Sequence, residues 1–183
     1  NIWYVLTAGR GNLGGAVDGG SLINDSAIWI LGLTYRQAGL IFVGVSAGAI
    51  GWLVLRYGAR WRERWLALGL MALTLFLLPT QIHERFMSFA FAPLLLAAAH
   101  DRRVLAGYGL VIVANTINLL RHLAFFPAVQ EALSHRGWAW ASAFIALAGF
   151  GYLYSILIIG IINEASSLEP QAQRRSAVME HTS

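Results

Sequence analysis

Five long runs of apolar residues dominate the chain, and short polar connections separate them. They lie at 38–55, 65–80, 86–99, 104–120 and 137–162. A helix that crosses a bilayer needs about 20 predominantly apolar residues, within a range of roughly 17–25. The pattern therefore predicts an all-α protein, a polytopic bundle of about five transmembrane helices. Because the second and third runs are short, we expect them to form a tight hairpin.

The two ends of the chain are more polar than the five runs. Residues 10–28 are rich in Gly, Asn, Asp and Ser, which predicts an external loop. Residues 1–9 look like the last turns of an apolar segment, so we expect the chain to be the C-terminal part of a longer protein. The predicted organisation is an end region at 1–32, a five-helix bundle at 33–162 and a polar cytoplasmic tail at 163–183. The tail is expected to be disordered or weakly helical.

Composition supports a membrane protein and excludes other classes. Of the 183 residues, 57% are hydrophobic and only 12% are charged, which is unusual for a soluble domain. All 13 basic side chains are arginine, but they lie in short loops and not among aromatic residues on one face. A nucleic-acid partner is therefore excluded, and membrane lipids are the expected surroundings. Without cysteine, the chain has neither disulfides nor a thiolate metal site.

The distribution of arginine predicts how the bundle is oriented. The connections 56–64 and 100–103 carry six arginines, and the tail at 163–183 carries two more. The opposite connections and the N-terminal region carry five. Because cytoplasmic loops hold the excess of basic residues, the first group and the C-terminus are predicted to be cytoplasmic. The N-terminal loop and the segment 77–89 then face outward.

An imidazole, a carboxyl group and a guanidinium stand together between the second and third runs, as His83, Glu84 and Arg85. Ionisable groups within a membrane span cost roughly 2.5–3.5 kcal/mol at the helix centre, and they tend to mark a functional pathway. A solvated hairpin tip with an Arg–Glu pair explains the cluster equally well. The residue four positions after His83 is Met87, so the H-E-x-x-H zinc motif is incomplete and no metal site is predicted.

Further cations are expected on the same face. Arg121 and His122 end the fourth run, and Arg136 opens the fifth. Together with Arg85 they would present three guanidiniums, each of which matches phosphate oxygens in a bidentate geometry. The cluster predicts a lipid-linked phosphate or pyrophosphate as ligand. The alternative for Arg121 and Arg136 is separate contact with lipid head groups.

Three other patterns have structural interpretations. Residues 9–14, GRGNLG, match the dinucleotide-binding fingerprint, but no βαβ unit surrounds them, which favours a Gly-rich loop. Asn115 and Asn118 share one face of the fourth run and predict hydrogen bonds between helices. Small residues at Gly44, Ala47 and Gly51 would permit another helix to approach closely.

Segments 33–44 and 78–103 resemble the C-terminal half of bacterial polytopic glycosyltransferases of the GT-C superfamily. In those enzymes a segment of the form P-T-x-x-H-E-R-Y closes one span and opens the next. Here it reads Pro79-Thr80-Gln81-Ile82-His83-Glu84-Arg85-Phe86. NIWYVL at the start is similar to an Asn-x-Trp element of the same proteins, so the resemblance covers about residues 1–125.

The resemblance implies an integral protein of the bacterial cytoplasmic membrane whose partner is a polyprenyl-phosphate-linked sugar donor, bound at the outer face. It implies that Arg85 and His83 contact the donor phosphate, while Glu84 orients Arg85 or a sugar hydroxyl. The catalytic acid of these enzymes lies in an earlier external loop, so Asp18 and Asp25 are not assigned that role. The catalytic residues stay unknown.

On this interpretation the chain is inactive without its N-terminal half. The complete enzyme would be an inverting transferase, with or without a divalent metal, and no cofactor is assigned to this chain. The alternative is a non-catalytic structural or accessory subunit that packs against other membrane subunits of a larger complex.

Overall fold

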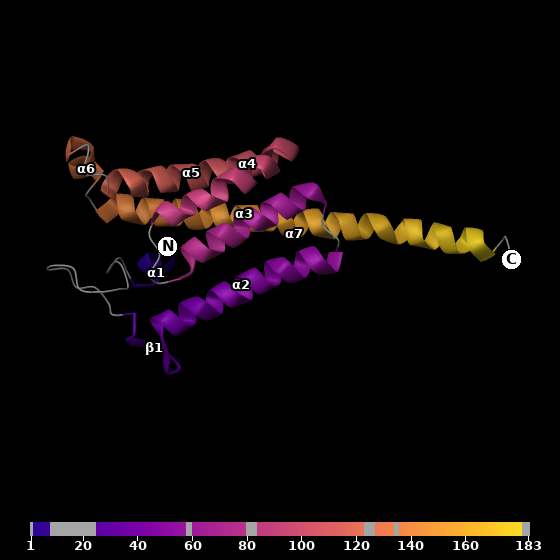
Figure 1. Cartoon of the computed structure of the whole chain (residues 1–183), viewed down its shortest axis with the longest axis horizontal. Helices are drawn as coiled ribbons and strands as arrows, with labels where there is room; N and C mark the ends of the chain where they lie inside the picture. The colour runs from indigo at the N-terminus through magenta and orange to yellow at the C-terminus, as the bar shows by residue number, and fades with distance from the viewer. Residues whose placement is uncertain are drawn as a thin grey trace.

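The protein is an elongated bundle built mainly of helices (Figure 1). A computed structural model describes residues 2–7, 25–57, 60–79, 84–122, 127–133 and 136–180. The helices are α1 (Ile2–Leu6), α2 (Tyr35–Tyr57), α3 (Trp61–Leu77), the 3₁₀ helix η1 (Glu84–Ala90), α4 (Phe91–His100), α5 (Arg102–His122), α6 (Pro127–Leu133) and α7 (Arg136–Glu180).

Within the described residues, three helical segments are long and apolar enough to cross a membrane, at 35–57, 102–120 and 137–163. The 17 residues of α3 span about 26 Å at about 1.5 Å per residue, slightly less than the ~30 Å hydrocarbon core of a bilayer. The seven residues of η1 and the ten of α4 together span about 29 Å. The helical class is thus confirmed, and the three apolar helices agree with a membrane protein, while the count of five spans stays a prediction.

The second and third apolar runs form the predicted hairpin, because α3 packs against both η1 and α4. The side of α3 that faces the core is a leucine stripe at helical spacing, in which every side chain is fully buried: Leu66, Leu70, Leu73 and Leu77. A Cβ atom at Gly69 would lie 2.6 Å from the side chain of Leu94 on α4. Only glycine permits this close approach of the two helices.

Helices α5 and α7 form the most extensive helix pair of the bundle. The Ser142 hydroxyl donates a hydrogen bond to Asn118 Oδ1 at 2.9 Å, so the prediction that Asn118 links two helices is confirmed. Asn115 is buried beside it, and its Oδ1 has no hydrogen-bond partner among the described residues. A Cβ at Gly107 would lie 2.5 Å from Leu153, so this pair also depends on a glycine.

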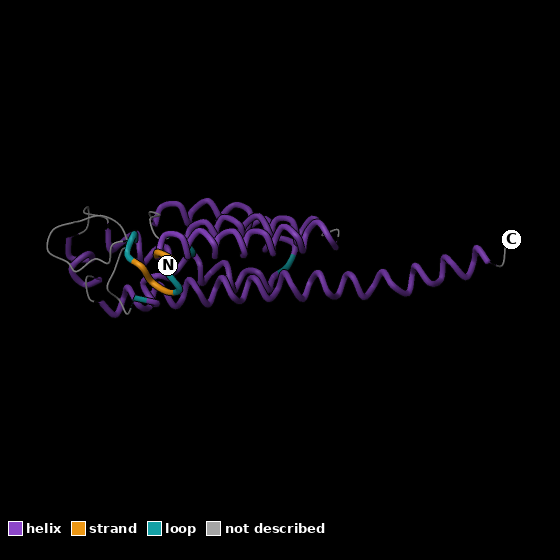
Figure 2. The backbone as a smooth tube through the Cα atoms, turned by 90° about the horizontal axis from the view of Figure 1, so that it is seen from below, coloured by secondary structure: helices purple, strands orange, loops and turns teal. Residues whose placement is uncertain are grey.

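A short antiparallel hairpin precedes α2 and departs from the all-α prediction. Strand β1 (Ile28–Ile30) pairs with β2 (Leu33–Thr34), and Figure 2 shows the hairpin in orange. The turn residues Leu31 and Gly32 have φ of 51° and 79°, the left-handed backbone that a two-residue hairpin turn requires. The prediction of loop and helix alone was wrong here, because β-branched and aromatic residues on both sides of a tight turn favour strands.

Helix α7 is far longer than a membrane is thick. Its 45 residues extend about 67 Å at about 1.5 Å per residue, and its C-terminal part projects alone beyond the bundle (Figures 1 and 2). The tail was expected to be disordered or weakly helical, but the helix continues without a break from residue 163 to Glu180. The predicted boundary at 162–163 is therefore not a boundary of secondary structure.

Candidate functional site

The backbone brings five of the six predicted site residues to one end of the bundle, which we call the η1 end. Glu84 and Arg85 open η1, Arg121 and His122 close α5, and Arg136 opens α7. Helix η1 packs against α5, and α5 packs against α7. His83 lies outside the described residues, as do the side chains of the other five. Joint contact of these six residues with a phosphate group therefore stays a prediction.

An apolar groove of about 590 Å³ lies between α1, α2, the end of α3 and α7. Its apolar side chains are Ile2, Ile41, Phe42, Val45, Leu78 and Phe150. Two polar side chains, Ser46 and Tyr154, also line it, and the Ser46 hydroxyl lies 3.1 Å from that of Thr74. Because this hydroxyl already has a partner, the groove offers an almost wholly apolar surface of the kind that accepts a hydrocarbon chain.

The groove is directly connected to the segment that carries the predicted site. Leu78 lines the groove and immediately precedes Pro79, the first residue of the P-T-x-x-H-E-R segment. The indole Nε1 of Trp3 donates a buried hydrogen bond of 2.6 Å to the Leu78 carbonyl. Helix α1 therefore fixes the backbone at the point where the chain leaves α3 for the His83 to Arg85 cluster.

An aromatic cluster holds Trp3 in this position. Trp3 makes edge contacts with Trp29 and Tyr35, at ring-centroid distances of 5.2 and 5.6 Å, and it stacks on Phe42 at 5.9 Å. Trp3 itself is 1% exposed. Such aromatic pairs contribute about 0.5–1.5 kcal/mol each beyond their area burial. The cluster thus ties α1, the β-hairpin and α2 together at one end of the groove, to which Phe42 also belongs.

Asp25 supports the start of α2 and so has a structural role in the described part of the chain. It is buried, and its backbone carbonyl accepts the Arg36 N–H at 3.0 Å, in the first turn of α2. The next such bond runs from the Tyr35 N–H to the Ala27 carbonyl at 3.2 Å. These carbonyls satisfy donors that a helix start leaves unpaired. The other external acid considered above, Asp18, lies outside the described residues, and so does the GRGNLG stretch.

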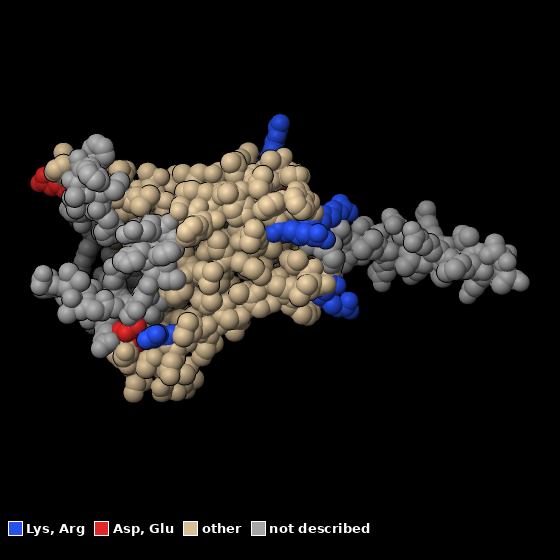
Figure 3. Space-filling view, in the orientation of Figure 1, with Lys and Arg blue, Asp and Glu red and all other residues tan. Residues whose placement is uncertain are grey.

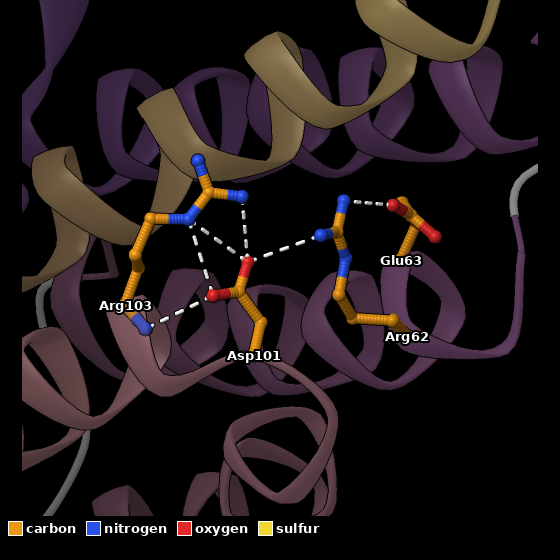
Figure 4. A network of polar contacts seen from close by, with 4 residues as sticks. All are labelled: Arg62, Glu63, Asp101 and Arg103. Atoms are coloured by element: carbon orange, nitrogen blue, oxygen red, sulfur yellow. Dashed lines mark hydrogen bonds and ion pairs between the residues drawn. The ribbon is translucent and has the colours of Figure 1, made fainter.

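The sequence analysis missed a network of charged side chains at the opposite end of the bundle (Figure 4). Arg62 forms ion pairs with Glu63 and with Asp101, the latter with 3.0 Å between Nη1 and Oδ2. Arg103 also binds Asp101, with 2.8 Å between Nη2 and Oδ2. The hydrogen bond from Arg103 lowers the pKa of Asp101 below its ordinary value. The signal in the sequence was the pair of opposite charges in each of two connections, 62–63 and 101–103.

Most arginine side chains of the described part of the chain gather at this end, from which α7 projects (Figure 3). We call it the arginine-rich end and define it by Arg56, Arg60, Arg62, Arg64, Arg102 and Arg103. The same connections were predicted to be cytoplasmic. Their gathering at one end agrees with the alternation of the apolar runs, whereas the side of the membrane stays a prediction.

No group of three or more His, Asp or Glu in the described ranges is placed to hold a metal ion. Neither a family model, nor a curated protein, nor a solved structure matches this chain.

Proposed function

We propose that this chain is the membrane-embedded C-terminal portion of a GT-C type glycosyltransferase, and that it binds a polyprenyl-phosphate-linked sugar at the outer face of a bacterial cytoplasmic membrane. The observation that carries the proposal is the hydrogen bond from Trp3 to the Leu78 carbonyl. Trp3 belongs to the Asn-x-Trp element, and Leu78 directly precedes the P-T-x-x-H-E-R segment. Two parts of the resemblance that are 75 residues apart therefore meet in space.

In this proposal the donor binds in two parts. The phosphate contacts Arg85 and His83, with Arg121, His122 and Arg136 near the same end of the bundle, while the polyprenyl chain lies along the apolar groove. Lipid tails are as apolar as leucine, so moving the chain from the bilayer into the groove gains little free energy. The groove therefore orients the donor. Charge-assisted hydrogen bonds to phosphate, worth about 1.5–3 kcal/mol each, supply most of the affinity.

The reaction itself requires groups that are not assigned to this chain. A carboxylate from an external loop would act as the general base on the acceptor hydroxyl. The arginines would stabilise negative charge on the departing polyprenyl phosphate. Glu84 would orient Arg85 or a sugar hydroxyl. On this proposal the chain alone binds the donor and does not transfer the sugar.

Donor binding by the purified chain tests the proposal. In nanodiscs, Arg85→Ala is expected to weaken binding of a polyprenyl-phosphate sugar by about tenfold or more, because each 1.4 kcal/mol is tenfold in affinity. The matched control is Arg36→Ala, which removes a guanidinium at an exposed position near the start of α2 and should leave the affinity unchanged. Equal affinity of the Arg85→Ala and wild-type chains would remove Arg85 from the site.

One observation favours the alternative of a structural subunit. A Cβ at Gly44 or at Gly48 on α2 would meet no described atom within 4 Å, so this face is open to another helix. Gly51, in contrast, already lies against Met71 of α3.

The encoding reading frame separates the two proposals. An upstream region with an acidic external loop supports the enzyme, whereas stoichiometric copurification with other membrane subunits, in the absence of such a region, supports the structural role.

A further inference from the structure

The β-hairpin carries apolar side chains on its outer surface, which we call the apolar tip and define by Ile28, Ile30 and Leu31. These side chains are 72%, 51% and 92% exposed. Figure 1 shows the hairpin beside the start of α2, on the side that faces away from α4 and α5. The apolar tip therefore projects outward from the bundle, where a hairpin surrounded by water would carry polar residues.

Both faces of strand β1 are apolar. Successive side chains of a strand point to opposite faces. Trp29 points inward, where it contacts Trp3 and Tyr35 at ring-centroid distances of 5.2 and 5.9 Å. Ile28 and Ile30 therefore point away from this aromatic cluster. A strand with water on its outer face alternates apolar and polar residues, whereas a strand with hydrocarbon on that face carries apolar residues there.

The turn of the hairpin also favours apolar surroundings. Its central residues, Leu31 and Gly32, both have positive φ, and Asn-Gly is the sequence preferred for such a turn. A left-handed backbone is strained for leucine, whereas asparagine adopts it more readily. With its side chain almost fully exposed, Leu31 gains little from packing within the chain. Contact with an apolar medium outside the chain would offset the strain.

The apolar tip adjoins a helix of membrane length. Helix α2 begins at Tyr35, directly after β2, and only 17% of its apolar stretch is buried within the protein. Exposed apolar side chains continue along it, at Leu40 and Val45. No charged residue occurs between Asp25 and Arg36. The surface of the tip is thus continuous with the surface that α2 presents to lipid in a membrane.

The size of the apolar tip favours a lipid surface over a protein partner. A stable protein interface takes about 20–30 residues from each partner, whereas the tip presents three. Insertion into lipid requires no matching surface and depends on the buried apolar area. The aromatic residues beside the tip, Trp29 and Tyr35, are of the two types enriched at the boundary between hydrocarbon and water. The bilayer is therefore the partner that the tip fits.

The backbone of the hairpin limits how deep it can lie. A sheet of two strands leaves both outer edges without a neighbouring strand, and open sheet edges do not occur within the hydrocarbon region. The apolar side chains of an interfacial segment reach about 5–10 Å into the boundary between head groups and acyl chains. The side chains of the tip can therefore enter this boundary while the backbone stays hydrated.

We infer that the apolar tip inserts into the bilayer interface at the η1 end, with the hairpin backbone at the level of the head groups. The hairpin then anchors the start of α2, and with it the aromatic cluster of Trp3, at a fixed depth. This anchor requires a bilayer but no sugar donor. Loss of donor binding would therefore leave the anchor unchanged, and the two proposals can fail separately.

Spin labels on single cysteines test the insertion. The chain contains no cysteine, so labels can be placed at Leu31, at Leu40 of α2 and at the exposed Ser26 before the hairpin. The full chain is reconstituted into vesicles of phosphatidylcholine and phosphatidylglycerol. Collisions are measured with oxygen, which concentrates in hydrocarbon, and with a water-soluble nickel complex. The labels at Leu31 and Leu40 should collide mainly with oxygen, and the label at Ser26 mainly with nickel.

Two results of this measurement would overturn the anchor. If the label at Leu31 collides with nickel as often as the label at Ser26, the tip lies in water. If the label at Leu31 is shielded from both reagents, protein covers the tip in place of lipid, from a second copy or from another part of the chain.

Substitutions at Leu31 separate membrane contact from folding. Leu31→Asn suits the left-handed turn, so the Tm in detergent micelles should stay the same or rise. In vesicles it should raise the water-accessible fraction of a label at Ile28 about tenfold, because burial of one leucine side chain shifts an equilibrium by about this factor. Leu31→Phe keeps an apolar side chain and should leave the label shielded. Equal accessibility of the label in these two variants would contradict the anchor.

Discussion

Replacing Trp3 by phenylalanine removes one hydrogen bond while most of the aromatic packing is kept. The indole is 1% exposed and donates to the Leu78 carbonyl at 2.6 Å. Without the indole N–H, a buried carbonyl loses its side-chain donor, which costs about 1–3 kcal/mol. The aromatic contacts with Trp29, Tyr35 and Phe42 survive in part. We therefore expect Trp3→Phe to lower the free energy of unfolding by about 1–3 kcal/mol.

Reversible unfolding in mixed detergent micelles would measure this change. For a chain of this size, 1 kcal/mol corresponds to a shift in Tm of about 2–4 °C. The matched control is Trp52→Phe, since Trp52 is 57% exposed and forms an edge contact with Tyr57 at 5.8 Å. Exposed substitutions of this kind usually change stability by less than about 0.5 kcal/mol.

The hydrogen bond from Trp3 also bears on donor binding, because Leu78 precedes the P-T-x-x-H-E-R segment. Trp3→Phe should weaken binding of the polyprenyl-phosphate sugar, whereas Trp52→Phe should not. If the two variants lose the same stability within about 0.5 kcal/mol, the indole does not hold α1 to the end of α3. The structural basis of the proposed donor site would then be refuted.

Three further predictions follow from single positions. Gly107→Ala should destabilise by about 1–2 kcal/mol in the same unfolding assay, because the clash with the buried Leu153 exceeds the gain in helix propensity. Gly109→Ala, with no atom within 4 Å of its Cβ, should stabilise by about 0.5–1 kcal/mol instead. The lowered pKa of Asp101 means that its stabilising contribution is present above its ordinary value of 3.8 and is lost as the pH falls below it. Asp101→Asn should therefore be less stable than wild type at pH 6 and should approach it at pH 3. Gly151→Leu should fill the apolar groove and weaken donor binding about tenfold, whereas Gly109→Leu should not; equal affinities of these two variants would exclude the groove.

The apolar runs were sufficient to predict the main helices, because a membrane-length helix needs only length and composition. Helices α2, α5 and α7 each cover a predicted run. The pattern also predicted that Asn118 bonds to another helix. It could not predict Ser142 as the partner, because that pairing depends on how α5 packs against α7.

Two elements could not be predicted from the sequence for specific physical reasons. The hairpin at 28–34 is too short for a clear alternation. Its turn places Leu31 in a left-handed conformation that Asn or Gly usually adopts. The ion pair of Arg62 and Asp101 joins residues 39 positions apart. Each connection alone has the sequence of a solvated charged loop. Only the packing of α4 beside α3 brings the side chains of Arg62 and Asp101 together.

The candidate donor site was likewise predictable only in part. The three guanidiniums of Arg85, Arg121 and Arg136 predicted a phosphate ligand, and the family resemblance implied that Arg85 and His83 contact it; both stay predictions. The apolar groove was not predictable from the sequence. It forms only where α1 lies beside the end of α3 and where Gly151 leaves open space on α7.

The length of α7 gives the molecule a lever arm. Some 17 residues follow the membrane-length segment that ends at Asn163, a rod of about 26 Å beyond the bundle at about 1.5 Å per residue. If the helix moves as one rigid body, a tilt of about 10° at the membrane displaces the tip by about 4–5 Å. Gly160 and Asn163 lie just before this rod, so a small tilt of the helix at these residues would be magnified at the C-terminus.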